Sequence, residues 1–180
     1  VQTGQRDFGE NYLQEALEKQ EAVARPELIW HFIGPIQSNK TRGIAENFAW
    51  VHSIDRLKIA ERLSAQRPVS APLLNVCIEV NVSSEASKSG VLPEALASFV
   101  DEVAVLPRLK LRGLMAIPAP TTDPAKQRAA FRQVRELFDG LNQRGCPLDT
   151  LSMGMSADLE AAIAEGATLV RIGTAIFGLR

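Results

Sequence analysis

The chain has 180 residues, of which 46% are hydrophobic, and its 20 basic residues are balanced by 21 acidic ones. This composition fits one globular domain, 1–180, with a sizeable core. The formal net charge of −1 argues against a dedicated nucleic-acid or membrane-surface binder, because both classes usually carry a basic patch. With only two cysteines, the chain is not expected to form a disulfide framework, so we predict a cytoplasmic protein. From the balanced charge we expect no membrane or nucleic-acid partner.

Short apolar runs alternate with helical patterns along the chain. The expected strands are 6–11, 28–34, 49–54, 73–82, 110–118, 149–155 and 168–177. Apolar residues recur at helical spacing in 92–107 and 124–145, and a further helix is expected over 156–166 with Ser156 as its N-cap. This alternation is typical of a parallel sheet covered by helices.

Two architectures fit such a sheet: a doubly wound open sheet and a (β/α)8 TIM-type barrel. Barrel strands carry polar residues at their carboxyl ends, as the strands ending near Asn11 and Glu79 do here. No glycine-rich dinucleotide turn follows the first strand, which also favours the barrel. Only seven strands are counted, no Met begins the sequence, and Gly4 lies where a helix would end. We therefore predict an α/β barrel seen from strand two to strand eight, with the first strand–helix unit missing.

Arg171 lies inside the almost wholly apolar segment LVRIGTAIFG. A buried, unpaired guanidinium costs several kcal/mol, so we expect either a side-chain partner, such as Glu79, or a ligand. In barrels, the loops after strands seven and eight often hold a phosphate. The Ser156 hydroxyl, the close approach allowed by Gly173, and the Thr174 hydroxyl suit that task. The alternative is that Ser156 only caps a helix and Gly173 only packs.

Seven segments carry a resemblance to a known family: FGENY, WHFIGPIQSNK, HSID, SKSG, LRGLMAI, LSMGMSAD and VRIGTAIFG. In this order they resemble the YggS/PROSC family of pyridoxal phosphate (PLP)-binding proteins, also called pyridoxal phosphate homeostasis proteins. The resemblance implies a PLP-binding barrel like the N-terminal domain of alanine racemase, occurring alone without the racemase's second domain. We expect a lone barrel of this kind to be a monomer. It also implies buffering or delivery of PLP to PLP-accepting apoenzymes, without robust catalysis.

By the same resemblance, Arg171 reaches the pyridine nitrogen of PLP, and Ser156, Gly173 and Thr174 hold its phosphate. Met155 belongs to the same loop, and Asn11 is either a contact of the cofactor or a turn residue. An arginine cannot accept a hydrogen bond from a pyridinium, so the ring stays neutral and is a weak electron sink, which suits either a racemase-type reaction with a restrained intermediate or a carrier. The family's Schiff-base lysine lies on the first barrel strand. No lysine of this sequence occupies a matching position, so no catalytic residue is assigned. The lysines present are Lys19, Lys40, Lys58, Lys88, Lys110 and Lys126.

Other polar residues leave alternatives open. Lys88 and the donor-rich loop 37–40 either contact a ligand or are solvated loop residues, and loop 37–40 can also begin a helix. His31 and His52 are not at metal-ligand spacing, so we expect core or rim histidines and no metal site. The alternative functions are a PLP-dependent racemase or lyase, although alanine racemase uses a base from a second domain, and a sugar-phosphate isomerase or aldolase with Glu79 as base.

Overall fold

The computed structural model describes residues 3–83 and 89–178, in which strands and helices alternate along the chain. In chain order the elements are β1 (Asp7–Glu10), α1 (Leu13–Val23), β2 (Ile29–Phe32), α2 (Thr41–Asn47), β3 (Trp50–Ile54), α3 (Leu57–Gln66), β4 (Leu74–Glu79), the 3-10 helix η1 (Pro93–Ala95), α4 (Leu96–Ala104), β5 (Leu109–Met115), α5 (Pro124–Gln143), β6 (Thr150–Met155), α6 (Leu159–Ala164), β7 (Leu169–Arg171) and α7 (Thr174–Phe177). None of the described helices is both long and apolar enough to cross a membrane.

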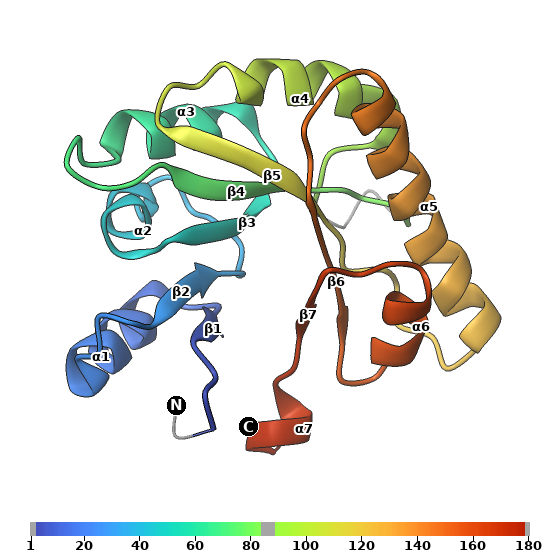
Figure 1. Ribbon diagram of the computed structural model, residues 1–180, viewed down its shortest axis with the longest axis horizontal. Coiled ribbons are helices and arrows are strands. Elements are labelled where there is room, and N and C mark those ends of the chain that lie inside the picture. Colours follow the sequence, from blue (N-terminus) through green and yellow to red (C-terminus); the bar gives the residue numbers. More distant parts are fainter. Residues whose placement is uncertain (1–2, 84–88, 179–180) are drawn as a thin grey trace.

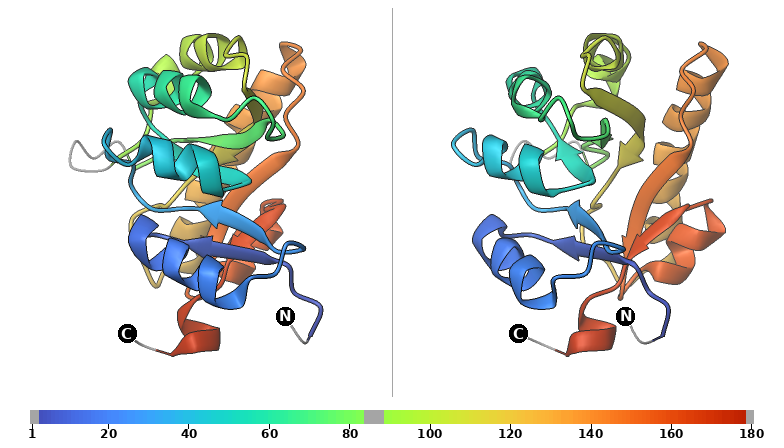
Figure 2. Two further views of the ribbon diagram at one scale, coloured as in Figure 1. Left: turned by 90° about the vertical axis from the view of Figure 1, so that its left-hand side faces the viewer. Right: turned by 60° about the vertical axis from the view of Figure 1, so that its left-hand side comes forward.

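The described strands form one parallel sheet in the order β1-β2-β3-β4-β5-β6-β7, so each strand pairs with its neighbours in sequence. Helices α1 to α6 lie around the outside in the same order (Figure 1). The edge strands β1 and β7 lie on the same side of the molecule, as the turned views confirm (Figure 2). The sheet is thus a nearly closed barrel of seven strands, as predicted, and the eighth strand stays a prediction.

The sequence explains where the longest helix begins and ends. The Asp123 carboxylate accepts hydrogen bonds from the backbone N–H groups of Ala125 and Lys126, and Pro124 occupies the first turn, where no N–H is needed. The apolar stripe of α5 is buried against the sheet. Gly145 follows the helix with a φ of 90°, a conformation that favours glycine, so the predicted end of this helix is confirmed.

The last predicted strand, 168–177, is too long. Strand β7 ends at Arg171, and a single helical turn, α7, follows after Gly173. Ile176 and Phe177 are 68% and 77% exposed, so this apolar run is not buried in the sheet. A short apolar run has no clear periodicity, and for this reason the sequence pattern did not separate strand from helix here.

One buried arginine stabilises the amino-terminal half of the barrel. Arg67, which is 7% exposed, donates from Nη1 to the carbonyl oxygens of Ala45 and Phe48 at 2.6 and 2.7 Å, and from Nε to that of Pro72 at 2.9 Å. Two of these carbonyls lie at the end of α2, where backbone oxygens lack helical partners. Arg67 therefore satisfies backbone groups that the fold would otherwise bury unpaired.

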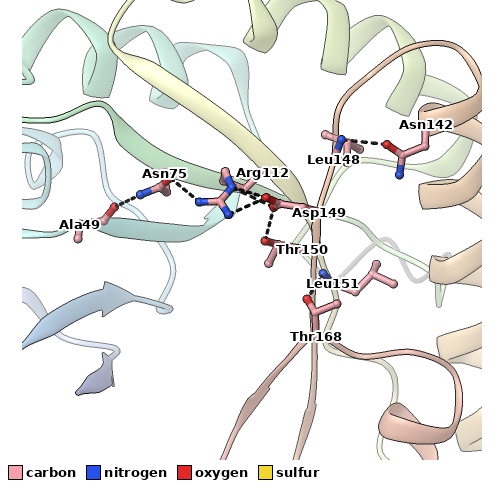
Figure 3. A network of polar contacts seen from close by, with 9 residues as sticks. All are labelled: Ala49, Asn75, Arg112, Asn142, Leu148, Asp149, Thr150, Leu151 and Thr168. Atoms are coloured by element: carbon pink, nitrogen blue, oxygen red, sulfur yellow. Dashed lines mark hydrogen bonds and ion pairs between the residues drawn. The ribbon is translucent and has the colours of Figure 1, made fainter. Parts of the chain in front are cut away.

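Charged and polar side chains also close the amino ends of several strands (Figure 3). Arg112 forms a forked ion pair with the Asp149 carboxylate, with a shortest distance of 2.7 Å, and donates to Asn75 Oδ1 at 2.9 Å. Its guanidinium lies 4.7 Å from the ring centroid of Trp50. Hydrogen bonds from Arg112 hold the pKa of Asp149 below its usual value. This network joins β3, β4, β5 and the start of β6 at the end opposite Arg171.

Candidate functional site

Arg171 is the last residue of β7, and its guanidinium is turned into the barrel. Nη1 donates to the backbone oxygen and the Oγ of Ser152, both at 2.7 Å, and Nη2 donates to the Ala116 carbonyl at 2.9 Å. Burial lowers the pKa of Arg171 to about 10, and nearby carboxylates such as that of Asp158 partly oppose this. Within the described residues Arg171 forms no ion pair, so the predicted alternative of a direct pair with Glu79 is wrong.

The guanidinium of Arg171 keeps donors for a ligand. A guanidinium has five N–H groups, and the three bonds above use both hydrogens of Nη1 and one of Nη2. The Nε–H and the second hydrogen of Nη2 make no hydrogen bond to another described residue. The side chain is therefore fixed by the protein and still presents two N–H groups to an acceptor of a bound molecule.

The loops after β6 and β7 meet, as predicted. The N–H of Ala175 donates to Ser156 Oγ at 3.3 Å, although the two residues are 19 positions apart in sequence. Gly173 and Thr174 are exposed beside this contact, and a Cβ added at Gly173 would find nothing within 4 Å. The loops thus place a serine hydroxyl and the backbone of Gly173 and Thr174 around open space, which suits a small anion.

The predicted role of Ser156 as a helix N-cap is wrong. Helix α6 begins at Leu159, and Asp158 holds the N-cap position. The Asp158 carboxylate instead accepts the N–H of Met155 at 2.6 Å, which closes a turn between β6 and α6 and leaves the Ser156 hydroxyl for Ala175. Ser156 and Asp158 also line a cavity of about 410 Å³ that extends to the start of α5. Met155, 36% exposed, lies at the end of β6 in the same loop.

For the other candidates at this end of the barrel, Asn11, loop 37–40 and Lys88, a ligand contact stays a prediction. Asn11 directly follows β1, and its backbone packs so closely on Gly34 that a Cβ there would lie 2.2 Å from the Asn11 carbonyl oxygen. Its side chain is exposed, and contact with a cofactor stays a prediction. Loop 37–40 forms a turn before α2, in which the Lys40 N–H bonds to the Gln37 oxygen at 2.9 Å. Lys88 lies outside the described residues.

A carboxyl group with an unusual pKa stands near Arg171. Glu79 is the last residue of β4 and only 9% exposed, and Asp55 directly follows β3. Burial raises the pKa of Glu79 to about 7; the Asp55 charge acts in the same direction and Arg171 opposes both. This end of the barrel therefore holds a side chain that can take up or release a proton near neutral pH.

His31 and His52 are buried, at 4% and 0% exposure, as expected for core histidines. Their rings are hydrogen-bonded, with 2.9 Å between His31 Nδ1 and His52 Nε2, and His52 Nδ1 lies 2.7 Å from Ser152 Oγ. Sequence reasoning missed this contact with the partner of Arg171. The one available signal was that polar residues occur within apolar strands, where they must face the interior. Within the described residues, no group of three or more metal-ligating side chains is placed to hold a metal ion.

Comparison with known proteins places this geometry in a family. A family model described as the N-terminal domain of alanine racemase matches residues 1–180. A pyridoxal phosphate homeostasis protein of Pseudomonas aeruginosa is 68% identical over 177 residues, which cover 98% of this chain and 76% of that protein. The protein of the same name in Escherichia coli K12 is 55% identical over 183 residues, covering all of this chain and 78% of that protein. The chain belongs to the family of pyridoxal phosphate homeostasis proteins.

Solved structures agree with this family membership. The PipY protein of Synechococcus elongatus, determined without PLP, is 40% identical and has a TM-score of 0.89 over 97% of this chain and 83% of its own. PipY with PLP bound is 39% identical, with a TM-score of 0.87 over 97% of this chain and 82% of its own. An alanine racemase of Clostridium difficile has a TM-score of 0.82 over 99% of this chain and 46% of its own, at 14% identity, which shows a shared fold alone. The predicted family and the predicted barrel are both confirmed.

Proposed function

We propose that this pyridoxal phosphate homeostasis family member binds pyridoxal 5′-phosphate at the carboxyl ends of its strands and takes part in the homeostasis of that cofactor. The observation that carries the proposal is Arg171, which three hydrogen bonds fix next to the joined loops of Ser156 and Thr174, while two of its N–H groups make no hydrogen bond to another described residue. The names of the relatives and the PLP-bound PipY structure support the same ligand.

The chemistry of the site fits the cofactor. A free N–H of Arg171 suits the pyridine nitrogen, and the Ser156 hydroxyl with the N–H groups of Gly173 and Thr174 suits the phosphate. Met155 and Asn11 would flank the ring. When bound, PLP supplies a reactive aldehyde, and these residues bind and orient it. Because Arg171 can only donate, it would leave the ring nitrogen unprotonated and the cofactor a weak electron sink, which suits either a carrier or a racemase-type reaction with a restrained intermediate.

We infer further that the protein is a monomeric, cytoplasmic carrier that hands PLP to apoenzymes and lacks efficient racemase or lyase activity. The curated relatives are named as homeostasis proteins, not as enzymes. The single tyrosine, Tyr12, is 59% exposed at the start of α1, which does not suit a racemase base. Cys77 and Cys146 are free thiols, in keeping with a reducing compartment.

A ligand-stabilisation experiment tests this function. PLP at about 100 times its Kd should stabilise the protein by about 2.7 kcal/mol, seen as a rise of the Tm, whereas a sugar phosphate at the same concentration should give little. Arg171→Ala should weaken PLP binding by about tenfold or more. Equal stabilisation by a sugar phosphate would favour the isomerase alternative, and no stabilisation by PLP would overturn the proposal. Racemisation of alanine at an enzyme's rate would overturn the carrier role.

A further inference from the structure

A continuous series of hydrogen bonds crosses the barrel interior and ends at Arg171. We call it the interior network: Asp7 on β1, His31 on β2, His52 on β3, Ser152 on β6 and Arg171 on β7. The consecutive distances are 3.1, 2.9, 2.7 and 2.7 Å. Only Asp7 is well exposed, with 53% of its side chain accessible, while both histidines and Ser152 are buried. The network thus connects the surface at the start of β1 with the proposed cofactor site.

With both rings neutral, the Asp7 end of the interior network fixes every hydrogen in it. The Asp7 carboxylate only accepts, so His31 donates from Nε2 and its Nδ1 accepts from His52 Nε2. His52 Nδ1 then accepts the hydroxyl hydrogen of Ser152, whose oxygen accepts from Arg171. In this single arrangement both rings are neutral, and each of the four contacts joins one donor to one acceptor.

The surroundings of the histidines favour this neutral state. Burial lowers the pKa of His31, against the opposing effect of Asp7, and lowers that of His52 much further, with the charges of His31 and Arg171 adding to the effect. Trp50 stacks on His31 with ring centroids 5.4 Å apart and separates it from Arg112. A proton added to His52 Nδ1 would require Ser152 Oγ to accept from both His52 and Arg171, and the hydroxyl hydrogen would lose its acceptor.

We propose that Ser152 and His52 are positioning residues that orient the Arg171 guanidinium toward its ligand. The inference rests on the proposed function, since it deepens the role of Arg171 as the contact of the cofactor ring. A nonpolar interior would pack equally well, and buried polar groups carry a desolvation cost unless all are paired. Here both histidines and Ser152 are paired, and the series ends on Arg171, two of whose N–H groups make no hydrogen bond to another described residue. Ser152 supplies two of the three bonds that fix Arg171, one of them through its hydroxyl.

Substitution of the serine separates positioning from stability. Ser152→Ala removes the hydroxyl bond but keeps the two carbonyl bonds to Arg171, so the Kd for PLP should rise by about tenfold, as expected for loss of one hydrogen bond to a charged group. Ser64→Ala is the matched control, because Ser64 is also buried, at 4% exposure, and its hydroxyl binds the Arg108 N–H far from this site. The control should lower the Tm and leave the Kd unchanged.

Two further measurements test the inference without relying on the Kd of Ser152→Ala alone. In ligand-free wild type, ¹⁵N NMR should show His52 protonated at Nε2, and the Arg171 Nε–H signal should shift in Ser152→Ala but not in Ser64→Ala. His52→Asn, whose amide oxygen can still accept from Ser152, should bind PLP more tightly than His52→Leu. Protonation of His52 at Nδ1, or a Ser152→Ala variant with unchanged Kd and unchanged Arg171 signal, would overturn the inference. Failure of the wild type to bind PLP would instead overturn the proposed function, and the NMR results on ligand-free protein would still decide the inference.

Discussion

Glu79 should make the stability of this protein fall as the pH rises. Its pKa is raised from 4.5 to about 7, mainly because the carboxyl group is buried. Below pH 4.5 the group is protonated in both the folded and the unfolded state. Between pH 4.5 and 7 only the unfolded chain ionises, so ionisation favours unfolding. The penalty is complete above pH 7.

The size of this effect follows from the pKa. Each tenfold change in proton affinity corresponds to about 1.36 kcal/mol, so the rise of the pKa to about 7 gives a total penalty of about 3 kcal/mol, of which about 2.5 kcal/mol falls between pH 5 and pH 8. Glu79→Gln keeps the shape of the side chain and cannot ionise. The variant should therefore gain about 2.5 kcal/mol on wild type over this range.

Urea unfolding at pH 5, 6, 7 and 8 measures the difference. Protonation of His31 and His52 destabilises the folded protein as the pH falls below about 6.5, but it does so in both proteins and cancels in the comparison. Asp55→Asn provides a second check, because loss of that charge lowers the pKa of Glu79 and moves the decline in stability to lower pH. A difference between Glu79→Gln and wild type that stays constant from pH 5 to pH 8 would refute the reasoning.

Two further predictions concern the scaffold. Arg67→Met should lower the free energy of unfolding by about 3 kcal/mol, because three backbone carbonyls lose their donor; a urea midpoint within error of wild type would contradict this. Gly113→Ala should destabilise the protein by at least about 3 kcal/mol or prevent folding, since its Cβ would lie 1.7 Å from the Thr150 carbonyl oxygen. Gly140→Ala, in the last turn of α5 with open space around it, should instead raise stability by about 0.5–1 kcal/mol, and thermal unfolding of this pair compares the two sites directly.

Local patterns in the sequence were sufficient to predict the architecture. Apolar runs, helical spacing and end signals such as Gly145 are encoded by residues close together in the chain. They placed seven strands and the three helices that follow the fourth, fifth and sixth of these strands. The prediction for the segment after Arg171 was wrong because a four-residue helix and a short strand have the same apolar composition. Ser156 was wrongly predicted to be a helix cap, since the competing turn through Asp158 depends on side-chain geometry, and its contact with a phosphate stays a prediction.

The sequence by itself determined the α/β barrel, the family resemblance and the end of the barrel at which we propose the site. It also showed that Arg171 must have a partner, because a guanidinium cannot remain buried and unpaired. Only the tertiary structure decided that the partners of Arg171 are Ser152 and the backbone carbonyl of Ala116, directly after β5. It also decided that His52, 100 residues before Ser152 in the chain, is hydrogen-bonded to the Ser152 hydroxyl. The physical reason is that closure of the sheet brings β2 and β3 opposite β6 and β7 across the interior. No short-range pattern in the chain encodes a contact across that distance.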